Sequence, residues 1–260
     1  MKRSVPLKIT AKCLFTITLI LLLISCFGGS KVKKEEKALN KAIGIEEHFQ
    51  LGFTAAERGN LEEAIAEYKK VLKLDSKHPR AHLNLGMAYG RQGKWKQEIS
   101  EYKRAISIDP NFAEAYFNLG VAYGEKGDIN EAITRYQKAL QINPNYVEAH
   151  NNLGNIYFRK GKIEEALTEY QKAVAINPGY ARGHYNIGNV YRQQGKGEEA
   201  IASFQKALET NPKYGEAHYN LAILYFEKKE YPQAIQHCDQ ALKLGVIVDS
   251  KFLDRLKSYR

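Results

Sequence analysis

Two consecutive stretches of 34 residues decide the fold of this chain: AEAYFNLGVAYGEKGDINEAITRYQKALQINPNY (113–146) and VEAHNNLGNIYFRKGKIEEALTEYQKAVAINPGY (147–180). The same pattern continues toward both ends, so that residues 34 positions apart form columns. A small-residue column contains Gly52, Gly86, Gly120, Gly154, Gly188 and Ala222. An aromatic column contains Tyr68, Tyr102, Tyr136, Tyr170, Phe204 and, as its exception, Cys238. Self-similarity at a period of about 20–50 residues indicates stacked structural repeats.

Each repeat is expected to contain two helices. In residues 113–146, apolar side chains recur at helical spacing in two runs: Leu119, Ala122 and Tyr123, then Ile129, Ile133, Tyr136 and Leu140. Gly127 lies between the runs, where a left-handed residue would end the first helix. Pro144 follows the second run and stops the second helix. A single hairpin of this kind cannot bury its apolar faces, so the repeats must stack.

This pattern resembles the tetratricopeptide repeat. In the third repeat, the signature positions of that family hold Gly120, Tyr123, Ala132, Tyr136, Ala139 and Pro144. The resemblance covers six repeats: 45–78, 79–112, 113–146, 147–180, 181–214 and 215–248. It implies an all-α fold, a right-handed α-solenoid of six helix hairpins with a concave groove for protein or peptide segments. Positions within a repeat are numbered below as slots, with slot 1 at Ile45, Pro79, Ala113, Val147, Ala181 and Gly215.

Residues 249–260 are expected to form a helix that caps the last repeat. Asp249 is a suitable N-cap residue. Phe252, Leu253 and Leu256 recur at helical spacing and would cover the apolar end of the sixth repeat, while the basic side of the helix faces water.

The first 25 residues are organised as a secretory signal peptide. Lys2, Arg3, Lys8 and Lys12 accompany an apolar run from Leu14 to Ile24. That run is shorter than the stretch of about 20 residues that a membrane-spanning helix needs, and small residues follow it. The sequence Leu23-Ile24-Ser25-Cys26 resembles the bacterial lipobox, in which the cysteine becomes the acylated first residue of the mature protein.

This second resemblance implies a lipoprotein with a signal peptide at 1–25, lipid chains such as palmitate on Cys26, and a lipidated tether of mixed charge over 26–44. Phe27 replaces the aspartate that retains some lipoproteins at the inner membrane. We therefore expect the protein in the cell envelope, lipid-anchored and facing the periplasm, with the outer membrane favoured over the inner. An uncleaved signal anchor is the alternative, and both readings place the repeats outside the cytoplasm.

Charge and cysteine usage exclude several classes of protein. The formal charge is +10, and removal of the four basic residues that precede Cys26 leaves 10 − 4 = +6, because no acidic residue precedes Glu35. This excess is too modest to indicate a nucleic-acid partner. Cys238 is the one cysteine in the repeats, so no disulfide framework is expected. Its place in the aromatic column predicts a small apolar residue in the core.

The column at slot 6 is the first candidate for partner binding. It contains Asn84, Asn118, Asn152, Asn186 and Asn220. Asparagine is unfavourable within a helix, so its recurrence asks for a reason. The family resemblance places slot 6 in the groove, where a carboxamide could donate to and accept from the backbone of a bound segment. The alternative is that these amides bond neighbouring repeats or water.

Slots 5, 9 and 12 flank this column on the same helix face. In the first three repeats, slots 5 and 9 hold apolar residues: Phe49, Phe53, Leu83, Met87, Phe117 and Val121. In the fourth and fifth repeats, slots 5, 9 and 12 hold polar and aromatic residues: Asn151, Asn155, Tyr185, Asn189 and Arg192. We therefore expect a groove with an apolar part and a polar part. The alternative for the apolar residues is packing within the superhelix.

Slot 4 holds a histidine in five repeats: His48, His82, His150, His184 and His218. Helices of neighbouring repeats are separated by about 8–10 Å, whereas zinc needs its nitrogen ligands at about 2 Å. These histidines are therefore expected to serve packing, and no metal site is predicted.

Charged columns are interpreted as solvated surface. Slot 26 holds Lys70, Arg104, Lys138, Lys172 and Lys206, and three of these follow a glutamate by three residues: Glu67, Glu101 and Glu169. That spacing favours ion pairs along a helix. Glu98 occupies slot 20, where the other repeats have alanine, and its carboxylate is expected to reach outward to water.

The sequence contains no motif for catalysis, such as a phosphate-binding loop, a His-Glu-x-x-His pair or a nucleophile elbow. We therefore predict no enzyme activity, no cofactor and no small-molecule substrate. The predicted function is a membrane-anchored scaffold that binds extended or helical segments of partner proteins to assemble an envelope complex. Its plan is similar to that of type IV pilotins. The alternative is a regulatory adaptor that docks a periplasmic hydrolase to cell-wall machinery.

Overall fold

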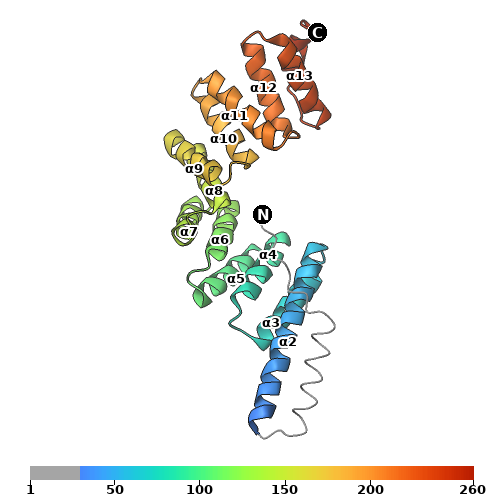
Figure 1. Ribbon diagram of the computed structural model, residues 1–260, viewed down its shortest axis with the longest axis vertical. Coiled ribbons are helices and arrows are strands. Elements are labelled where there is room, and N and C mark those ends of the chain that lie inside the picture. The colour runs from blue at the N-terminus through green and yellow to red at the C-terminus, as the bar shows by residue number, and fades with distance from the viewer. Residues whose placement is uncertain (1–29) are drawn as a thin grey trace. The chain divides into compact units, whose positions relative to one another are not determined.

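The computed structural model describes residues 30–260, and within that range it contains thirteen helices and no strand (Figure 1). The predicted signal peptide and Cys26 lie outside the described residues. The chain divides into two compact units, the first ending at Pro110 and the second covering Asn111–Arg260. An all-helical chain of paired hairpins is what the family resemblance predicted.

The first unit contains two helix hairpins. Its helices are α2 (Ser30–Glu57), α3 (Leu61–Leu74), α4 (Pro79–Arg91) and α5 (Trp95–Ile108). Helix α2 packs on α3, α4 packs on α5, and the hairpins meet mainly through α3 and α4. Tyr68, Val71 and Leu85 are among the buried side chains of the core between them. The stacking of hairpins thus supplies the core that no hairpin has alone.

Helix α2 is longer than the repeat pattern suggests, because it begins at Ser30 and not near Ile45. We expected residues 26–44 to form a tether, and from Ser30 onward that segment is helical. Its sequence explains the difference: it is rich in lysine, glutamate and alanine and contains no proline, so the packed turns after Ile45 can propagate toward the N-terminus. Among residues 30–260, no helix has an apolar stretch long enough to cross a bilayer.

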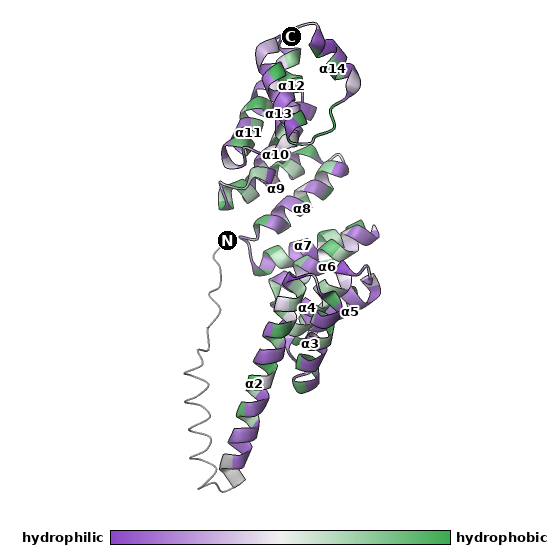
Figure 2. Cartoon of the chain, turned by 90° about the vertical axis from the view of Figure 1, so that its right-hand side faces the viewer, coloured by the Kyte–Doolittle hydropathy of each residue, from purple (hydrophilic) through white to green (hydrophobic). Residues whose placement is uncertain are grey.

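The second unit contains four hairpins and a terminal helix. Its helices are α6 (Ala113–Lys126), α7 (Ile129–Ile142), α8 (Val147–Arg159), α9 (Ile163–Ile176), α10 (Ala181–Gln193), α11 (Gly197–Thr210), α12 (Gly215–Glu227), α13 (Tyr231–Lys243) and α14 (Ser250–Lys257). Each odd-numbered helix from α7 to α11 packs both on its hairpin partner and on the first helix of the next repeat. Figure 2 shows that apolar and polar residues share individual helices, as this two-sided packing of amphipathic helices requires.

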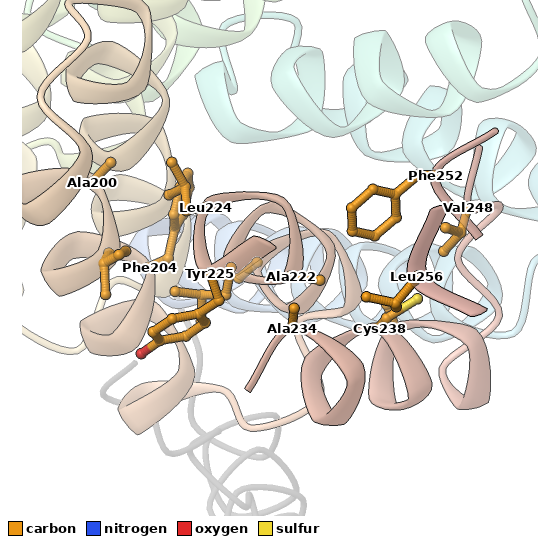
Figure 3. Packing of buried hydrophobic residues seen from close by; sticks show 14 of the residues in the cluster. Ala200, Phe204, Ala222, Leu224, Tyr225, Ala234, Cys238, Val248, Phe252 and Leu256 are labelled. Atoms are coloured by element: carbon orange, nitrogen blue, oxygen red, sulfur yellow. The ribbon is translucent and has the colours of Figure 1, made fainter. Parts of the chain in front are cut away.

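Helix α14 is the predicted C-terminal cap. The Asp249 side chain accepts a hydrogen bond from the backbone N–H of Lys251, at 3.2 Å, and so begins the helix. Phe252 and Leu256 are buried, and Figure 3 shows them on the side of the sixth repeat that carries Cys238. Cys238 itself is fully buried, which confirms its predicted place in the core.

An aromatic ring lies against a glycine in the first five hairpins. A Cβ atom added to Gly120 would be 2.8 Å from Cδ1 of Tyr136, and the corresponding distances at Gly52, Gly86, Gly154 and Gly188 are 2.6–2.8 Å. Carbon atoms that are not bonded do not approach so closely, so the ring occupies the space that a side chain would need. The sixth hairpin has Ala222 at the glycine position and Cys238 at the ring position. The smaller sulfur side chain therefore accompanies the larger small-slot residue.

Gly120→Ala is expected to lower the free energy of unfolding by about 1–3 kcal/mol, because the new methyl group displaces the buried ring of Tyr136. Gly124→Ala is the matched control in the same helix, since its Cβ would be 3.9 Å from the nearest atom, the Cβ of Ala132. That control should gain about 0.5–1 kcal/mol from helix propensity. Urea unfolding measures both, and equal effects of the two substitutions would contradict the close-contact explanation.

Glu98 corrects one expectation from the sequence. Its side chain does not reach outward but is buried, with 8% of the residue exposed. The Tyr102 hydroxyl donates a hydrogen bond to Oε1 of Glu98 at 3.3 Å, and the carboxyl lies where a Cβ of Gly90 would be, 2.5 Å from Oε1. The missing side chain at Gly90 therefore makes the room that the sequence comparison at slot 20 could not show.

Candidate partner-binding face

The slot-6 asparagines use their amide N–H groups on the preceding repeat or on their own helix. Asn152 Nδ2 donates to the Tyr136 hydroxyl at 3.4 Å, and Asn84 bonds the hydroxyl of Tyr68 in the same way. Asn118 Nδ2 donates to the carbonyl of Glu114, one turn earlier.

In the last repeats this contact becomes a network of amides. Asn186 Nδ2 donates to Oδ1 of Asn151 at 2.8 Å and to Oδ1 of Asn155 at 3.2 Å. One repeat later, Asn220 Nδ2 donates to Oδ1 of Asn189 at 3.2 Å and to the Tyr185 hydroxyl at 3.3 Å. Both donor asparagines thus bind residues one repeat earlier at slots 5 and 9.

These bonds support the alternative reading of the column for four of its five members. Their N–H donors hold neighbouring repeats together and are not presented to a ligand. Within residues 30–260 no hydrogen bond reaches Oδ1 of Asn118 or Asn186, and both residues are half-buried. A bound segment could therefore meet carbonyl acceptors here, which would receive its backbone N–H groups.

In the first unit, the apolar flanking residues separate into core and surface. Phe49 and Leu83 at slot 5 are buried, and Phe49 packs against the ring of Tyr68 with centroids 5.9 Å apart. Phe53 and Met87 at slot 9 are 46% and 41% exposed. The predicted self-packing therefore describes slot 5, while slot 9 forms an apolar surface on two adjacent first helices.

In the second unit, the flanking residues range from core to surface. Asn151 is fully buried, whereas Phe117, Val121, Asn155, Tyr185 and Asn189 are half-buried and Arg192 is exposed. Phe117 and Tyr185 each pack against the tyrosine that precedes the next first helix, Tyr146 and Tyr214, with centroids 4.7 Å apart in both pairs. The structure therefore brings these side chains to one helix face, with the aromatic rings held by their neighbours.

The slot-4 histidines belong to a polar motif that the sequence analysis missed. His48, His82 and His150 place Nδ1 within 2.7, 2.6 and 2.5 Å of a glutamate 19 residues later: Glu67, Glu101 and Glu169. The other oxygen of each glutamate bonds the slot-26 cation, Lys70, Arg104 or Lys172. The predicted glutamate–cation pairs are present, but each glutamate also ties the two helices of its hairpin together. Two columns in a constant 19-residue offset were the available signal.

Hydrogen bonding sets the charge of these glutamates. Burial raises the pKa of Glu169, but hydrogen bonds from His150 and Lys172 outweigh it and hold the pKa below its ordinary value. At Glu67 the hydrogen bond from Lys70 is the largest influence, and the pKa is again lowered. Because these carboxyls are easier to ionise in the folded chain, they stabilise it above their ordinary pKa and lose that contribution as the pH falls through the lowered pKa.

The sixth repeat replaces the glutamate with a second histidine. His218 Nε2 donates to the carbonyl of Pro212 at 3.1 Å, so its Nδ1 is left to accept from Nδ1 of His237, 2.8 Å away. Burial, followed by the charge of His218, lowers the pKa of His237 to about 4. His237 also stacks on Tyr225 at 5.5 Å. Among the described residues, no cluster of three or more histidine, cysteine or acidic side chains is arranged to hold a metal ion.

His237→Glu is expected to stabilise the protein at acidic pH. His237 is neutral in the folded chain, so its contribution is complete above pH 6.5 and is lost as the pH falls toward 4. A glutamate would restore the pair found in three other repeats. We expect a gain of roughly 1 kcal/mol at pH 5, allowing for solvent screening, and little change at pH 8. Thermal unfolding at the two pH values measures this.

His237→Gln separates the two contributions, because it removes the titrating group without adding a carboxylate. It should reduce the acid sensitivity but give a smaller gain at pH 5 than the glutamate. An unchanged pH dependence in both variants would show that the histidine pair does not control the acid stability of the sixth repeat.

Comparisons with known proteins identify the class to which this arrangement belongs. Models described as TPR repeat match residues 55–93, 91–127, 123–161, 154–195 and 188–229, and one described as tetratricopeptide repeat matches residues 215–244. Helix hairpins with a regular face of this kind define a helical-repeat protein. The chain belongs to the tetratricopeptide repeat family. A search of curated protein sequences finds no match.

Several solved structures share the fold. A crystal structure of MamA protein is 32% identical, with 66% of this chain and 94% of that chain covered and a TM-score of 0.56. The pilF protein of Pseudomonas aeruginosa is 19% identical, with 85% of this chain and 100% of that chain covered and a TM-score of 0.75. YrrB, described as a TPR protein with an unusual peptide-binding site, is 21% identical over 74% of this chain and 97% of its own, with a TM-score of 0.58. At their levels of identity, the last two show the fold alone.

Proposed function

We propose that this protein is a lipid-anchored scaffold of the cell envelope that holds segments of partner proteins on the face formed by slots 5, 6, 9 and 12. The family supports a protein–protein interaction role without catalysis. The observation that carries the proposal is the exposed apolar pair at slot 9 of the first unit, Phe53 and Met87. Large apolar side chains exposed side by side mark an interaction surface.

The two units offer different chemistry to a partner. The first unit offers apolar surface at slot 9, and the second offers half-buried amides and tyrosines with the exposed cation of Arg192. Apolar surface supplies most of the affinity, whereas carbonyl acceptors such as those of Asn118 and Asn186 fix the backbone of an extended or helical segment. Both would act together in the assembly of an envelope complex.

Phe53→Ser together with Met87→Ser is expected to weaken partner binding by about fivefold or more, because two apolar contacts are removed. Both positions are exposed, so the melting temperature should change little. Leu51→Ser is the matched control: Leu51 is 48% exposed on the same helix but lies at slot 7, on another face. Affinity purification after photocrosslinking from slot 9 identifies and quantifies the partner.

Recovery of the same partner in the same amount from the double variant would refute the proposed face. An equal loss with Leu51→Ser would show that general surface hydrophobicity, and not slot 9, determines binding.

Cys26→Ser tests the lipid anchor. The proposal expects loss of metabolic palmitate labelling and release of the protein from the membrane fraction, because no other residue would carry the acyl chains. Fractionation of cells that express the wild type and the variant measures both. Continued membrane association of an unlabelled variant would favour an uncleaved signal anchor.

A further inference from the structure

A cavity of about 410 Å³ lies at the C-terminal end of the second unit, where the end of α12, the turn to α13 and helix α14 come together. Phe226, Glu227, Lys229, Tyr231, Arg255 and Tyr259 line it, together with a serine. Phe226 occupies slot 12 of α12, one turn after Ile223 at slot 9. The cavity is therefore continuous in register with the candidate partner-binding face of the last repeat.

The aromatic side chains of this cavity hold one another in place. Tyr231 and Tyr259 are stacked with centroids 3.6 Å apart and planes 13° apart. Phe226 meets both rings edge-on, at 5.5 and 5.8 Å. The guanidinium of Arg255 lies 4.6 Å from the centroid of Phe226. A cation fixed over a ring in this way is pre-oriented, which lowers the entropy lost when it binds an anion.

Two cations of the cavity have no acidic partner. Within the described chain, neither Arg255 nor Lys229 makes an ion pair. The acidic residues nearby are engaged elsewhere: Glu230 pairs with Lys228, Asp254 with Lys257, and Asp239 with Arg260. Glu227 is the one acidic residue of the lining. Two cations and one carboxylate leave a single net positive charge, which matches a monoanion better than a doubly charged phosphate.

The backbone at Lys229 provides an independent observation. Lys229 has φ +64°, the one left-handed residue other than glycine in residues 30–260. The equivalent turns of the five preceding repeats have glycine: Gly59, Gly93, Gly127, Gly161 and Gly195. Glycine adopts this conformation without the strain that a Cβ introduces, so lysine is unfavourable for folding here. Strained residues of this kind concentrate at functional sites, and Lys229 brings its ammonium group to the cavity.

We propose that this cavity binds a carboxylate of an acidic peptide residue, placed between Arg255 and Lys229, while the neighbouring residue of the peptide packs on Phe226 and Tyr259. The planar guanidinium fits a carboxylate through paired N–H donors. The volume is within the range of small-ligand sites, enough for one or two residues. The inference rests on the proposed function, because it makes the cavity the end of the face that holds a partner segment.

Fluorescence anisotropy of the full chain with labelled hexapeptides tests the proposal. The probe is an end-blocked peptide of alternating glutamate and phenylalanine, compared with its glutamine counterpart. A glutamine peptide with a free C-terminal carboxylate separates terminal from side-chain carboxylates. We expect the glutamate peptide to bind about tenfold more tightly than the blocked glutamine peptide.

Three variants locate the binding. Arg255→Gln and Lys229→Gly should each weaken binding by about fivefold or more, whereas Lys251→Gln, an exposed basic residue of the same helix, should not. Lys229→Gly should also raise the melting temperature by roughly 2–4 °C, since it relieves the left-handed backbone. Weaker binding by a more stable protein cannot result from misfolding.

Equal binding of the glutamate and blocked glutamine peptides, or equal effects of Arg255→Gln and Lys251→Gln, would overturn the proposal. So would sedimentation with phosphatidylglycerol vesicles that depends on Arg255 and Lys229, because a lipid phosphate would then be the ligand. If the peptides fail while crosslinking from slot 9 still depends on Phe53 and Met87, the cavity proposal fails and the scaffold function stands. Loss of the slot-9 dependence alone would have the opposite meaning.

Discussion

The close contact between an aromatic ring and a glycine is the constraint on which each of the first five hairpins depends. The ring at slot 24 covers the backbone of slot 8, so the paired helices approach until no Cβ fits between them. That approach buries the neighbouring alanines completely, as at Ala64, Ala132 and Ala166. The sixth hairpin satisfies the same volume condition with Ala222 and Cys238, and the space beside the sulfur is covered by α14 (Figure 3).

Polar side chains then determine how the hairpins are held. Histidine–glutamate pairs join the two helices within a repeat, and the slot-6 asparagines join one repeat to the next. Each buried group has a partner, so these bonds avoid the cost of an unsatisfied polar atom and add geometric specificity to apolar packing. His218 and His237 keep the bond but replace the carboxylate with a base, which makes the last repeat differ in its response to acid.

The surface that remains is divided in its chemistry. Exposed Phe53 and Met87 give the first unit an apolar patch, whereas the second unit carries amides, tyrosines and cations. The cavity at Arg255 and Lys229 lies in the turn and capping helix that finish the last repeat, outside the repeating pattern. A repeat protein can thus keep its core columns constant and vary a few slots and its terminal helix, because those positions contribute little to the packing between hairpins.

The sequence by itself determined the number of repeats, the helical class and the buried columns, because a period of 34 residues leaves few alternatives for packing. It also placed Cys238 in the core and predicted α14. Only the tertiary structure decided which residues of the candidate face are surface: Phe49 and Asn151 are buried, while Phe53 and Arg192 are exposed. Glu98 over Gly90 and the histidine–glutamate pairs were equally hidden, since they depend on side-chain volumes and distances between different helices. Periodicity reports which side of a helix a residue occupies, but its partner there is set by three-dimensional packing.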